Sequence, residues 1–498
     1  MSRQFDQLSW MAAHVGDETA YADLDGAESL TFEQWERDSN RLAHGLTAAG
    51  VEPRDRVALY LESAHTSRWL TSYVAIHKAG AVVVPTNTRL TAREVRTILS
   101  HAEPVVAISS TALATTIDEI RDALPTLRMV IRVDTDEWQR ALDNDASPCD
   151  PPVGDDDLAD IMYTSGTTGL PKGIAVRHRN THIIENGEPA WTGESWLHGA
   201  PLFTFAGVAF IFNPMKMGMR ALYIARFDVD RWIDAVETHR PTCAFLVPSM
   251  VQLLLNAERF TSADLSSLTL VSIGSAPLAP SQHQAMAARL PGAMVTNNYS
   301  MTEAGTTFTF MPPDEITRRP GSVGIPMGGE VRIADDEGEP LPAGEIGEIL
   351  LRVGTHHREY YRDPDATERT WSGEWLHSGD LGSVDADGYL YIKGRKKDVI
   401  IRGGNNVLAG DVEAVLVEHP AVLEAAVIAV PHDVLGEDVG AFVVSRLGST
   451  IDVAALTAFC AERIADYKVP RRIWVIDELP RNATGKVVKS QLRIPEEA

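Results

Sequence analysis

Short apolar runs alternate with amphipathic helical segments over roughly the first 300 residues, and this alternation limits the folds open to the chain. RVALYL (56–61) is typical of a buried strand, a helical segment follows, and AVVVPT (81–86) is typical of the next strand. A repeated strand–helix–strand order favours parallel sheets covered by helices. Before these runs, Thr31 and Gln34 form a capping box that predicts a helix start, and Gly50 predicts its end. The sequence therefore predicts an α/β architecture with largely parallel sheets.

The pattern changes after about Ser322, where short predicted strands are separated by turn sequences. EVRIA, GEIGEILLR and GYLYIKG are divided by DDEG, PAGE and DADG, which favours a β-rich subdomain. The last hundred residues suggest a further small α+β unit, with strands at LEAAVIAV, GAFVVSRL and RRIWVI and a helix at 453–464. A chain of 498 residues is too long for one compact core, so several domains are expected.

Composition excludes several classes of protein. The formal net charge of -24 disfavours nucleic acid as a partner and docking on anionic membranes, and an anionic ligand would need local positive groups and magnesium. The N-terminus lacks the apolar segment of a signal peptide, and no apolar run approaches the ~18 residues of a membrane span. The three cysteines have no metal-ligand or disulfide spacing, which fits a cytoplasmic protein. The sequence leaves the oligomeric state open, a homodimer included.

The segment YTSGTTGLPKG, Tyr163 to Gly173, carries the strongest chemical signal. It follows a predicted buried strand and combines four hydroxyl residues, three glycines and Lys172. Glycines let backbone N–H groups approach a ligand, while hydroxyls and a lysine add donors and positive charge, so the segment is suited to phosphate oxygens. The spacing differs from the usual nucleotide-triphosphate loop, because Leu170 and Pro171 separate Gly169 from the lysine. A cluster of Gly, Ser and Thr alone is more often a solvated surface loop, whereas the lysine and the order of the residues favour a phosphate-binding segment.

TSGTTGLPKG closely resembles the signature of the adenylate-forming superfamily, which contains acyl-CoA synthetases, amino-acid adenylation domains and luciferases. Further motifs follow in the order of that superfamily. They are APLFTFAG (200–207), GSAP (274–277), NNYSMTE (297–303), GSVGIP (321–326), EWLHSGD (374–380), YIKGRKKDVIIRGGNNV (391–407) and PRNATGK (480–486). The resemblance implies a large N-terminal domain at 1–394 that binds ATP and the acyl group, a hinge at 395–398 and a small mobile C-terminal domain at 399–498.

The resemblance also implies a nucleotide site. Tyr299 would stack on the purine, Asp380 would accept hydrogen bonds from the ribose hydroxyls, and Arg395 would contact the ribose and α-phosphate region. Thr302 would bind phosphate, while Glu303, with Thr167, would hold Mg²⁺ beside the phosphates. The full predicted nucleotide-binding set is Thr164, Ser165, Gly166, Thr167, Thr168, Gly169, Lys172, Gly274, Ser275, Ala276, Pro277, Asn298, Tyr299, Ser300, Asp380 and Arg395.

In the superfamily, a lysine matching Lys486 bridges the substrate carboxylate and the α-phosphate while negative charge develops. The implied catalytic residues are therefore Lys486, Glu303 and Thr302. Asp398 matches the hinge, and Gly403 and Gly404 match the loop beside the CoA thiol. The resemblance implies two steps: an acid and ATP give an acyl-adenylate and pyrophosphate, and CoA then displaces AMP after the small domain pivots.

Two positions bear on the branch of the superfamily. Amino-acid-activating members carry an aspartate where this chain has Thr204, and the chain ends twelve residues after Lys486, so we expect an acyl-CoA ligase rather than an amino-acid module. Many acyl-CoA synthetases carry histidine at the position of Thr204, and proline at that of Ala409. These departures keep open a specialist for one half-reaction, or an adenylating enzyme with an acceptor other than CoA.

The resemblance places the acyl pocket at Thr204, Phe205, Gly207 and Val208. The apolar run FTFAGVAFIF (203–212) favours a hydrophobic or ring-containing carboxylic acid, although ordinary core packing explains its aromatic residues equally well. Fatty, aromatic, terpenoid and steroid acids all remain open. A nucleotide-binding regulator without turnover is the alternative from another class, and it would be expected to lose Lys486 or Glu303.

Overall fold

The computed structural model describes residues 3–26, 28–164, 171–181, 184–305, 309–354, 357–481 and 486–495. By its contacts the chain divides into two compact units. The first unit comprises Met1–Gly274, Ala285–Phe308 and Val353–Leu376, and the second comprises Ser275–Gln284, Thr309–Arg352 and His377–Ala498. The division at a 395–398 hinge stays a prediction.

One sheet of the first unit has the strand order β6-β5-β3-β4-β7-β8. Its strands are β3 (Arg56–Tyr60), β4 (Val82–Pro85), β5 (Val106–Ser109), β6 (Met129–Arg132), β7 (Leu158–Thr164) and β8 (Lys172–Arg177). Among the described strands the pairings are parallel, except for the antiparallel hairpin of β7 and β8. The predicted strands at 56–61 and 81–86 are therefore confirmed, and β8 lies at the edge of the sheet.

A second sheet in this unit has the order β13-β12-β11-β9-β10-β1-β2. Its strands are β1 (Thr19–Asp23), β2 (Glu28–Thr31), β9 (Ser195–His198), β10 (Arg220–Tyr223), β11 (Cys243–Leu246), β12 (Leu270–Ile273) and β13 (Met294–Asn297). In the described part of this sheet, β1 and β2 pair antiparallel and all the other neighbouring strands pair parallel. Parallel pairing brings the carboxyl ends of β12 and β13 side by side.

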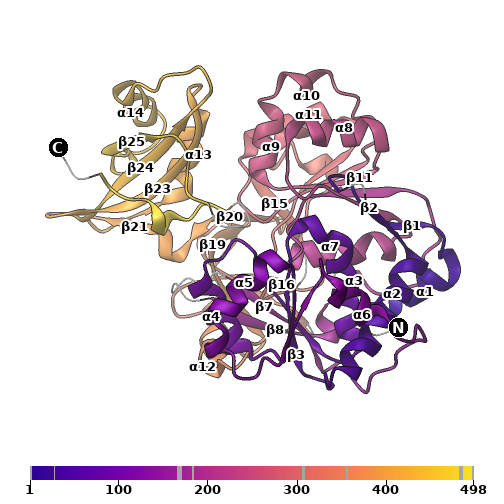
Figure 1. The fold of residues 1–498 in the computed structure, drawn as a ribbon. Helices are drawn as coiled ribbons and strands as arrows, with labels where there is room; N and C mark the ends of the chain where they lie inside the picture. Colours follow the sequence, from indigo (N-terminus) through magenta and orange to yellow (C-terminus); the bar gives the residue numbers. More distant parts are fainter. Residues whose placement is uncertain are drawn as a thin grey trace. The chain divides into compact units, whose positions relative to one another are not determined.

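Helices pack between and around these two sheets (Figure 1). Helices α1 (Gln4–Val15), α2 (Phe32–Ala48), α3 (Thr66–Lys78) and α7 (Phe205–Lys216) share one buried core with residues of both sheets. Helices α4 (Ala92–Ala102) and α5 (Thr111–Glu119) cover the opposite face of the β3–β8 sheet. The remaining helices up to residue 370 are α6 (Asp136–Leu142), α8 (Val229–His239), α9 (Pro248–Leu255), α10 (Glu258–Ser262), α11 (Pro280–Arg289) and α12 (Pro364–Thr370).

The second unit is richer in antiparallel strands, as its turn-rich sequence predicts. The path β14-β15-β20-β19-β17-β16 contains β14 (Thr309–Phe310), β15 (Ser322–Pro326), β16 (Glu330–Ala334), β17 (Gly347–Arg352), β19 (Trp375–Val384) and β20 (Leu390–Arg395). The short strand β18 (Trp371–Ser372) pairs with β19. The predicted β-rich subdomain is therefore confirmed.

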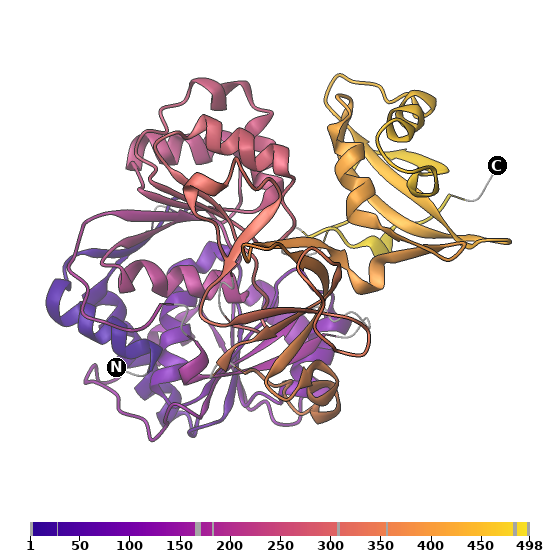
Figure 2. The same ribbon diagram turned by 180° about the vertical axis from the view of Figure 1, so that it is seen from behind.

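The C-terminal strands form a separate sheet, β22-β21-β24-β23, with β25 beside β24 (Figure 2). The strands are β21 (Val399–Arg402), β22 (Asn405–Leu408), β23 (Val422–His432), β24 (Gly436–Ser445) and β25 (Arg472–Ile476). Helices α13 (Ala409–Glu418) and α14 (Val453–Ala461) share a buried core with these strands. The helix predicted at 453–464 thus ends three residues early, where Glu462 caps α14.

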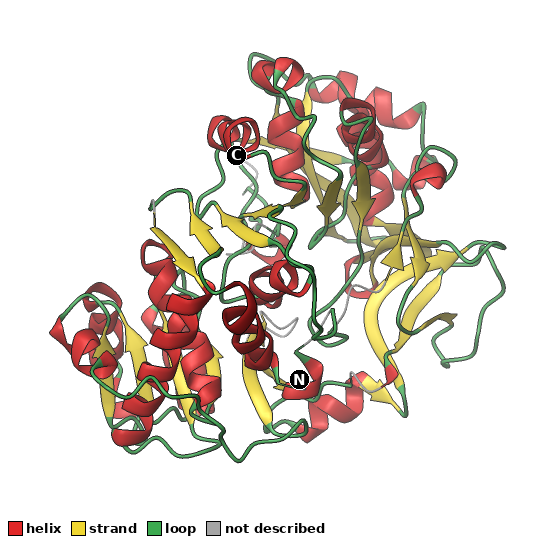
Figure 3. Ribbon diagram, turned by 90° about the vertical axis from the view of Figure 1, so that its right-hand side faces the viewer, coloured by secondary structure: helices red, strands yellow, loops and turns green. Residues whose placement is uncertain are grey.

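The same elements are coloured by type in Figure 3, with helices red and strands yellow. Single 3-10 turns connect several of them. These turns are η1 (Ser63–His65), η2 (Arg121–Ala123), η3 (His178–Asn180), η4 (Pro313–Glu315), η6 (Lys396–Asp398), η7 (Asp466–Lys468) and η8 (Lys489–Gln491). Within the described ranges, no helix combines the length and apolar character needed to cross a membrane.

The capping box predicted at the start of α2 is present. The Gln34 backbone N–H donates to Thr31 Oγ1 over 3.1 Å, and the Thr31 backbone N–H donates to Gln34 Oε1 over 3.1 Å. The helix then places Trp35 and Leu42 in the shared core, both fully buried. Gly50 follows the helix with a φ of 85°, a conformation that favours glycine.

We predict that Thr31→Ala lowers the free energy of unfolding by about 1 kcal/mol, because one backbone N–H at the start of α2 loses its acceptor. Equilibrium denaturation in urea measures the change, and Thr47→Ala on the same helix serves as a control, since Thr47 Oγ1 only donates to Ala43 O within the helix. Equal stability of Thr31→Ala and the wild type would contradict the prediction.

Candidate active site

The predicted phosphate segment is the connection of the β7–β8 hairpin. Thr164 ends β7, Lys172 begins β8, and the two are cross-strand partners. The intervening predicted residues Ser165, Gly166, Thr167, Thr168 and Gly169 lie outside the described residues. The Lys172 Nζ atom lies 4.9 Å from the centroid of the Tyr360 ring. A hairpin at a sheet edge therefore presents the lysine beside an aromatic residue that the sequence analysis did not predict.

The GSAP and NNYSMTE motifs begin at the carboxyl ends of two neighbouring parallel strands. Gly274 directly follows β12, and Asn298 directly follows β13. The Asn298 Nδ2 donates to Ser272 Oγ over 2.6 Å, which ties the two strand ends together. Ligands of open α/β sheets commonly bind at such carboxyl ends. Tyr299 is half-buried and Ser300 is exposed, while Ser275, Ala276 and Pro277 belong to the second unit.

The turn that contains Thr302 and Glu303 is held by two side chains from a distant part of the sequence. Arg358 Nη1 donates to the Thr302 carbonyl oxygen over 2.6 Å. The Tyr360 hydroxyl donates to Glu303 Oε1 over 3.1 Å. The structure therefore brings Glu303 and Lys172 to Tyr360, and the neighbouring Thr302 to Arg358, within the first unit.

The environment of these residues shifts two pKa values. Burial raises the pKa of the Tyr360 hydroxyl, and the nearby Glu303 carboxylate raises it further, so Tyr360 stays protonated and can donate. Burial lowers the pKa of Arg358 to about 10, against the opposing effect of the carboxylates of Asp160 and Glu303. Arg358 remains charged at neutral pH, because that value is still far above 7.

The predicted acyl residues lie around the start of α7. Thr204 is the N-cap of this helix: its Oγ1 accepts from the Gly207 N–H over 3.0 Å and donates to Pro201 O over 2.7 Å. A Cβ at Gly207 would collide with the backbone of Pro201, so this glycine permits a close approach of helix and loop. Val208 belongs to the buried core. Phe205 is half-buried, and the Arg358 guanidinium carbon lies 4.3 Å from its ring centroid.

Two of the three other aromatic residues of the run 203–212 lie in separate cores, and the third, Phe203, is half-buried. Phe212 is fully buried in the core shared by the two sheets. Phe210 is 9% exposed and packs against Phe245, with ring centroids 4.4 Å apart. Core packing therefore accounts for both of these rings, and Phe205 is the better candidate for contact with a substrate.

In the second unit, two predicted ribose residues form an ion pair across neighbouring strands. Asp380 in β19 and Arg395 in β20 are register partners, and Arg395 Nε lies 2.8 Å from Asp380 Oδ1. Asp380 is 6% exposed, and its backbone N–H donates to Ser378 Oγ over 3.0 Å. Pairing of β19 and β20 thus gives this carboxylate a fixed position.

The residues predicted for the second step lie on the C-terminal part of the second unit. Asp398 is half-buried at the end of η6, and Ala409 begins α13. Gly403 and Gly404 form the two-residue turn between β21 and β22, with φ values of 56° and 85°. Such a turn needs positive φ at both positions, which explains the two glycines without any ligand. Lys486 is exposed.

Tyr360 and Arg358 are the residues that sequence reasoning missed. They belong to the sequence REYY at 358–361, between two motifs that the sequence analysis used. The sequence did contain one signal for them: Arg358 and Tyr360 are two positions apart, so both side chains lie on the same face of an extended segment. The partner turn is more than fifty residues earlier, so only the fold could show the contact.

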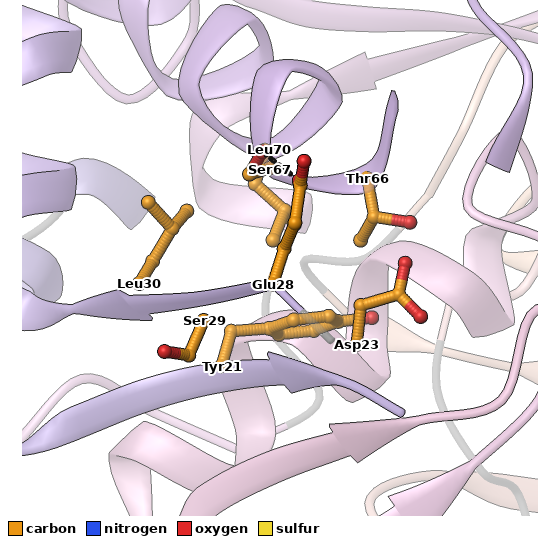
Figure 4. Close-up of a pocket in the computed structure, with 8 residues that line it drawn as sticks. All are labelled: Tyr21, Asp23, Glu28, Ser29, Leu30, Thr66, Ser67 and Leu70. Atoms are coloured by element: carbon orange, nitrogen blue, oxygen red, sulfur yellow. Dashed lines mark hydrogen bonds between the residues drawn. The ribbon is translucent and has the colours of Figure 1, made fainter. Parts of the chain in front are cut away.

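The described residues offer few competing sites. A pocket between β1, β2 and α3 is shown in Figure 4, where Ser67 Oγ donates to Glu28 Oε2 over 2.6 Å. This pocket has no enclosed room for a molecule the size of water. In the part of the chain that the structure describes, no three His, Cys, Asp or Glu residues gather as metal ligands.

Comparison with known proteins identifies the family of this chain. Residues 8–361 match the family described as AMP-binding enzyme, and residues 411–486 match its C-terminal domain. The chain belongs to the AMP-binding enzyme family. Within the adenylate-forming superfamily it falls in the acyl-CoA ligase branch, whose members are AMP-forming acid–thiol ligases.

Three similar proteins illustrate this branch. A feruloyl-CoA synthase of an Amycolatopsis species is 38% identical over 94% of this chain and 94% of its own. The fatty acid–acyl-carrier-protein ligase ScoC of Streptomyces coeruleorubidus is 34% identical over 97% of this chain and 95% of its own. The crystal structure of the anthranilate CoA ligase AuaEII with anthranoyl-AMP has a TM-score of 0.88 and 30% identity, and covers 97% of this chain and 95% of that one.

We predict that acid destabilises this ligase through His198, which ends β9. The side chain is fully buried, its Nε2 lies 3.2 Å from the Tyr21 hydroxyl, and burial lowers its pKa to about 3. The unfolded chain takes up this proton near the ordinary value of about 6.5, so it binds more protons than the folded chain between the two values. The contribution of His198 to stability is therefore complete above pH 6.5 and is lost as the pH falls toward 3.

His198→Gln should flatten the fall in unfolding free energy between pH 7 and pH 4.5, because it removes the titrating group and keeps a polar partner for Tyr21. Urea denaturation at the two pH values measures this slope, with the exposed His239→Gln as the control. Identical slopes for His198→Gln and the wild type would show that His198 does not cause the acid sensitivity.

Proposed function

We propose that this protein joins a ring-containing carboxylic acid to coenzyme A through an acyl-adenylate. The observation that carries this proposal is the cluster around Tyr360, whose ring contacts the Lys172 ammonium and whose hydroxyl donates to Glu303 in the Thr302–Glu303 turn. A lysine, a hydroxyl and a carboxylate suit a Mg-triphosphate, since they offer a cation and a donor to phosphate and an anionic oxygen to the metal.

In the first step the acid carboxylate attacks the α-phosphate of ATP and pyrophosphate leaves. Lys172 binds phosphate oxygens and Thr302 donates a hydrogen bond to phosphate. Tyr299 covers the purine, while Asp380 accepts from the ribose hydroxyls beside Arg395. Lys486 approaches the carboxylate and the α-phosphate as negative charge develops there, which lowers the barrier electrostatically.

The proposed metal is Mg²⁺, and the donor set of the site fits it. Mg²⁺ is usually held by one or two carboxylates together with substrate phosphates and water, so a single protein carboxylate is sufficient. Glu303 supplies that oxygen, with one of its oxygens already accepting from Tyr360. When bound, the ion would neutralise phosphate charge. The other predicted ligand, Thr167, lies outside the described residues.

In the second step the thiol of CoA attacks the acyl carbonyl and AMP leaves. We propose that a large domain at 1–394 and a small domain at 399–498 change their arrangement about Asp398 between the steps. Lys486 then leaves the site, and the turn at Gly403 and Gly404 borders the path of the thiol. This alternation lets one site serve two reactions.

Two observations support a ring-containing acid. Phe205 begins α7 with a half-buried ring, and Arg358 covers part of that ring. An aromatic side chain stacks well on a flat substrate. Two of the similar proteins are named for aromatic acids, ferulate and anthranilate. ScoC is named for a fatty acid, so the preference for an aromatic acid over a fatty, terpenoid or steroid acid rests on the Phe205 ring together with these two names.

The second candidate is adenylation for an acceptor other than CoA, or a specialist for one half-reaction. ScoC favours the first of these alternatives, because its name gives an acyl carrier protein as acceptor. Thr204 and Ala409 depart from the common acyl-CoA synthetase pattern, and these departures favour a specialist for one half-reaction. The presence of Lys486 supports the retention of adenylation.

The test is pyrophosphate release from Mg-ATP with a panel of aromatic, fatty, terpenoid and steroid acids, with and without CoA, and with products identified by mass. The proposal predicts AMP and an aromatic acyl-CoA. Accumulation of acyl-AMP despite CoA would transfer support to another acceptor. Thioester formation only from supplied acyl-adenylate would indicate the half-reaction specialist.

We predict that Lys486→Ala reduces acid-dependent pyrophosphate release by at least about 100-fold, as loss of one positioned charge-stabilising group does. Formation of acyl-CoA from supplied acyl-adenylate should change little, because Lys486 has left the site in that step. Arg463→Ala, which removes an exposed positive charge outside the predicted site and hinge, serves as the control. Normal pyrophosphate release by Lys486→Ala would refute the role of Lys486.

A further inference from the structure

Residues 358–361 lie extended along β8, and their side chains alternate between two sides. The Ala175 N–H donates to Glu359 O over 2.9 Å, and the Tyr361 N–H donates to Gly173 O over 2.7 Å. Since successive side chains of an extended chain point to opposite faces, Arg358 and Tyr360 share one face. Glu359 points the other way and pairs with Arg177 at 3.2 Å, where its side chain is 53% exposed.

Arg358 connects the Thr302–Glu303 turn to the start of α7. Besides its bond to Thr302 O, its guanidinium donates to the Asn180 carbonyl and lies 4.3 Å from the centroid of Phe205. Gly305, with a φ of 82°, makes room for it, because a Cβ there would lie 2.8 Å from the guanidinium carbon. A shift of the Phe205 ring would therefore be transmitted to the backbone of Thr302.

Arg358 is costly for the fold, which favours a role beyond packing. Its side chain is 1% exposed, and its Nε atom has no hydrogen-bond partner among the described residues. A buried charge with an unsatisfied donor destabilises a protein relative to an apolar side chain of similar size. In return, Arg358 holds three groups in place at once: the carbonyl oxygens of Thr302 and Asn180 and the ring of Phe205. An apolar side chain could not form the two hydrogen bonds.

Tyr360 connects the same turn to the β7–β8 hairpin. Its hydroxyl donates to Glu303, and its ring faces the Lys172 ammonium at 4.9 Å. Its backbone N–H donates to Thr367 Oγ1 over 3.0 Å, and its position on β8 is fixed by the bridge to Ile174. One rigidly held residue thus contacts both the carboxylate and the lysine.

We propose that Arg358 and Tyr360 are positioning residues that make the acid and Mg-ATP bind cooperatively. The path runs from Phe205 through Arg358 to the Thr302–Glu303 turn, and from the turn through Tyr360 to Lys172. A ligand that fixes one end of this path lowers the cost of fixing the other, so each ligand raises the affinity for the second. This inference rests on the proposed function.

The experiment uses calorimetry on the full-length protein. The affinity for a non-hydrolysable ATP analogue is measured with Mg²⁺ and with a chelator, and with and without the best acid of the panel. The variants are Tyr360→Phe, Arg358→Lys and, as the control, Tyr361→Phe. Tyr361 contacts His101 and Arg362 on the other side of the segment, so its hydroxyl has no place in the path.

In the wild type the acid should raise the affinity for the Mg-analogue. Tyr360→Phe should weaken Mg-analogue binding about tenfold, the effect of one hydrogen bond to a charged group, and leave metal-free binding unchanged. Arg358→Lys keeps the charge and loses the planar group, so each separate affinity should stay within about threefold while the cooperativity disappears. Tyr361→Phe should behave as the wild type.

Equal weakening with and without Mg²⁺ in Tyr360→Phe, or unchanged cooperativity in Arg358→Lys, would overturn the inference. If Arg358→Lys fails to fold, Phe205→Leu tests the same path from the acyl side and should also remove cooperativity. Failure of the proposed function is recognised separately, since the wild type would then release no pyrophosphate with any acid. The affinity for the ATP analogue with Mg²⁺ and with chelator can be compared without any acid. This comparison therefore still tests the role of Tyr360 if no acid is found.

Discussion

The pairing of the segment 358–361 with β8 is the constraint on which the candidate site of the first unit depends. Two backbone hydrogen bonds, at Glu359 and Tyr361, fix which side chains face the Thr302–Glu303 turn. The strand that receives them begins with Lys172. One edge strand therefore sets the position of the lysine and, through its neighbour, that of the carboxylate. A one-residue slip in this pairing would turn Arg358 and Tyr360 away from the site.

Electrostatics explains why such fixed positions matter in this protein. The chain has a formal net charge of -24, so the average field repels a triphosphate. Binding must then rely on local cations in defined places, among which Lys172 and Arg395 are candidates. The negative Glu303 contacts the same tyrosine as Lys172, so triphosphate binding at this site depends still more on the metal. A protonated Tyr360 between them donates to the anion and places its ring face toward the cation.

The sequence predicted the architecture well because its signals are local. Apolar runs marked β3 and β4, the Thr31 capping box marked the start of α2, and turn sequences marked the β-rich part. The loop signature and the order of the motifs were sufficient to predict the family. The ends of helices were predicted less accurately. Helix α14 ends at Ala461, and the next residues form a turn in which the Arg463 and Ile464 N–H groups both donate to Cys460 O, a change that composition does not signal.

Contacts between distant segments could not be predicted in this way. Thr204 was considered for the acyl pocket, yet its hydroxyl caps α7, and Gly207 allows helix and loop to approach. Gly403 and Gly404 were considered for CoA, and a hairpin turn alone already requires them. Arg358 and Tyr360 were absent from the prediction, because their partners are brought near only by the pairing with β8. Local patterns thus indicated a candidate site, and tertiary packing determined what each of its described residues contacts.

The most direct test of this account is a double-mutant cycle between Tyr360→Phe and Glu303→Gln, with the affinity for the Mg-ATP analogue as the measured quantity. If the hydroxyl acts by holding the Glu303 carboxylate, the second change should add little once the first has been made, and the effects should be clearly non-additive. If the two effects simply add, Tyr360 and Glu303 act independently, and the central contact of the account has no functional role.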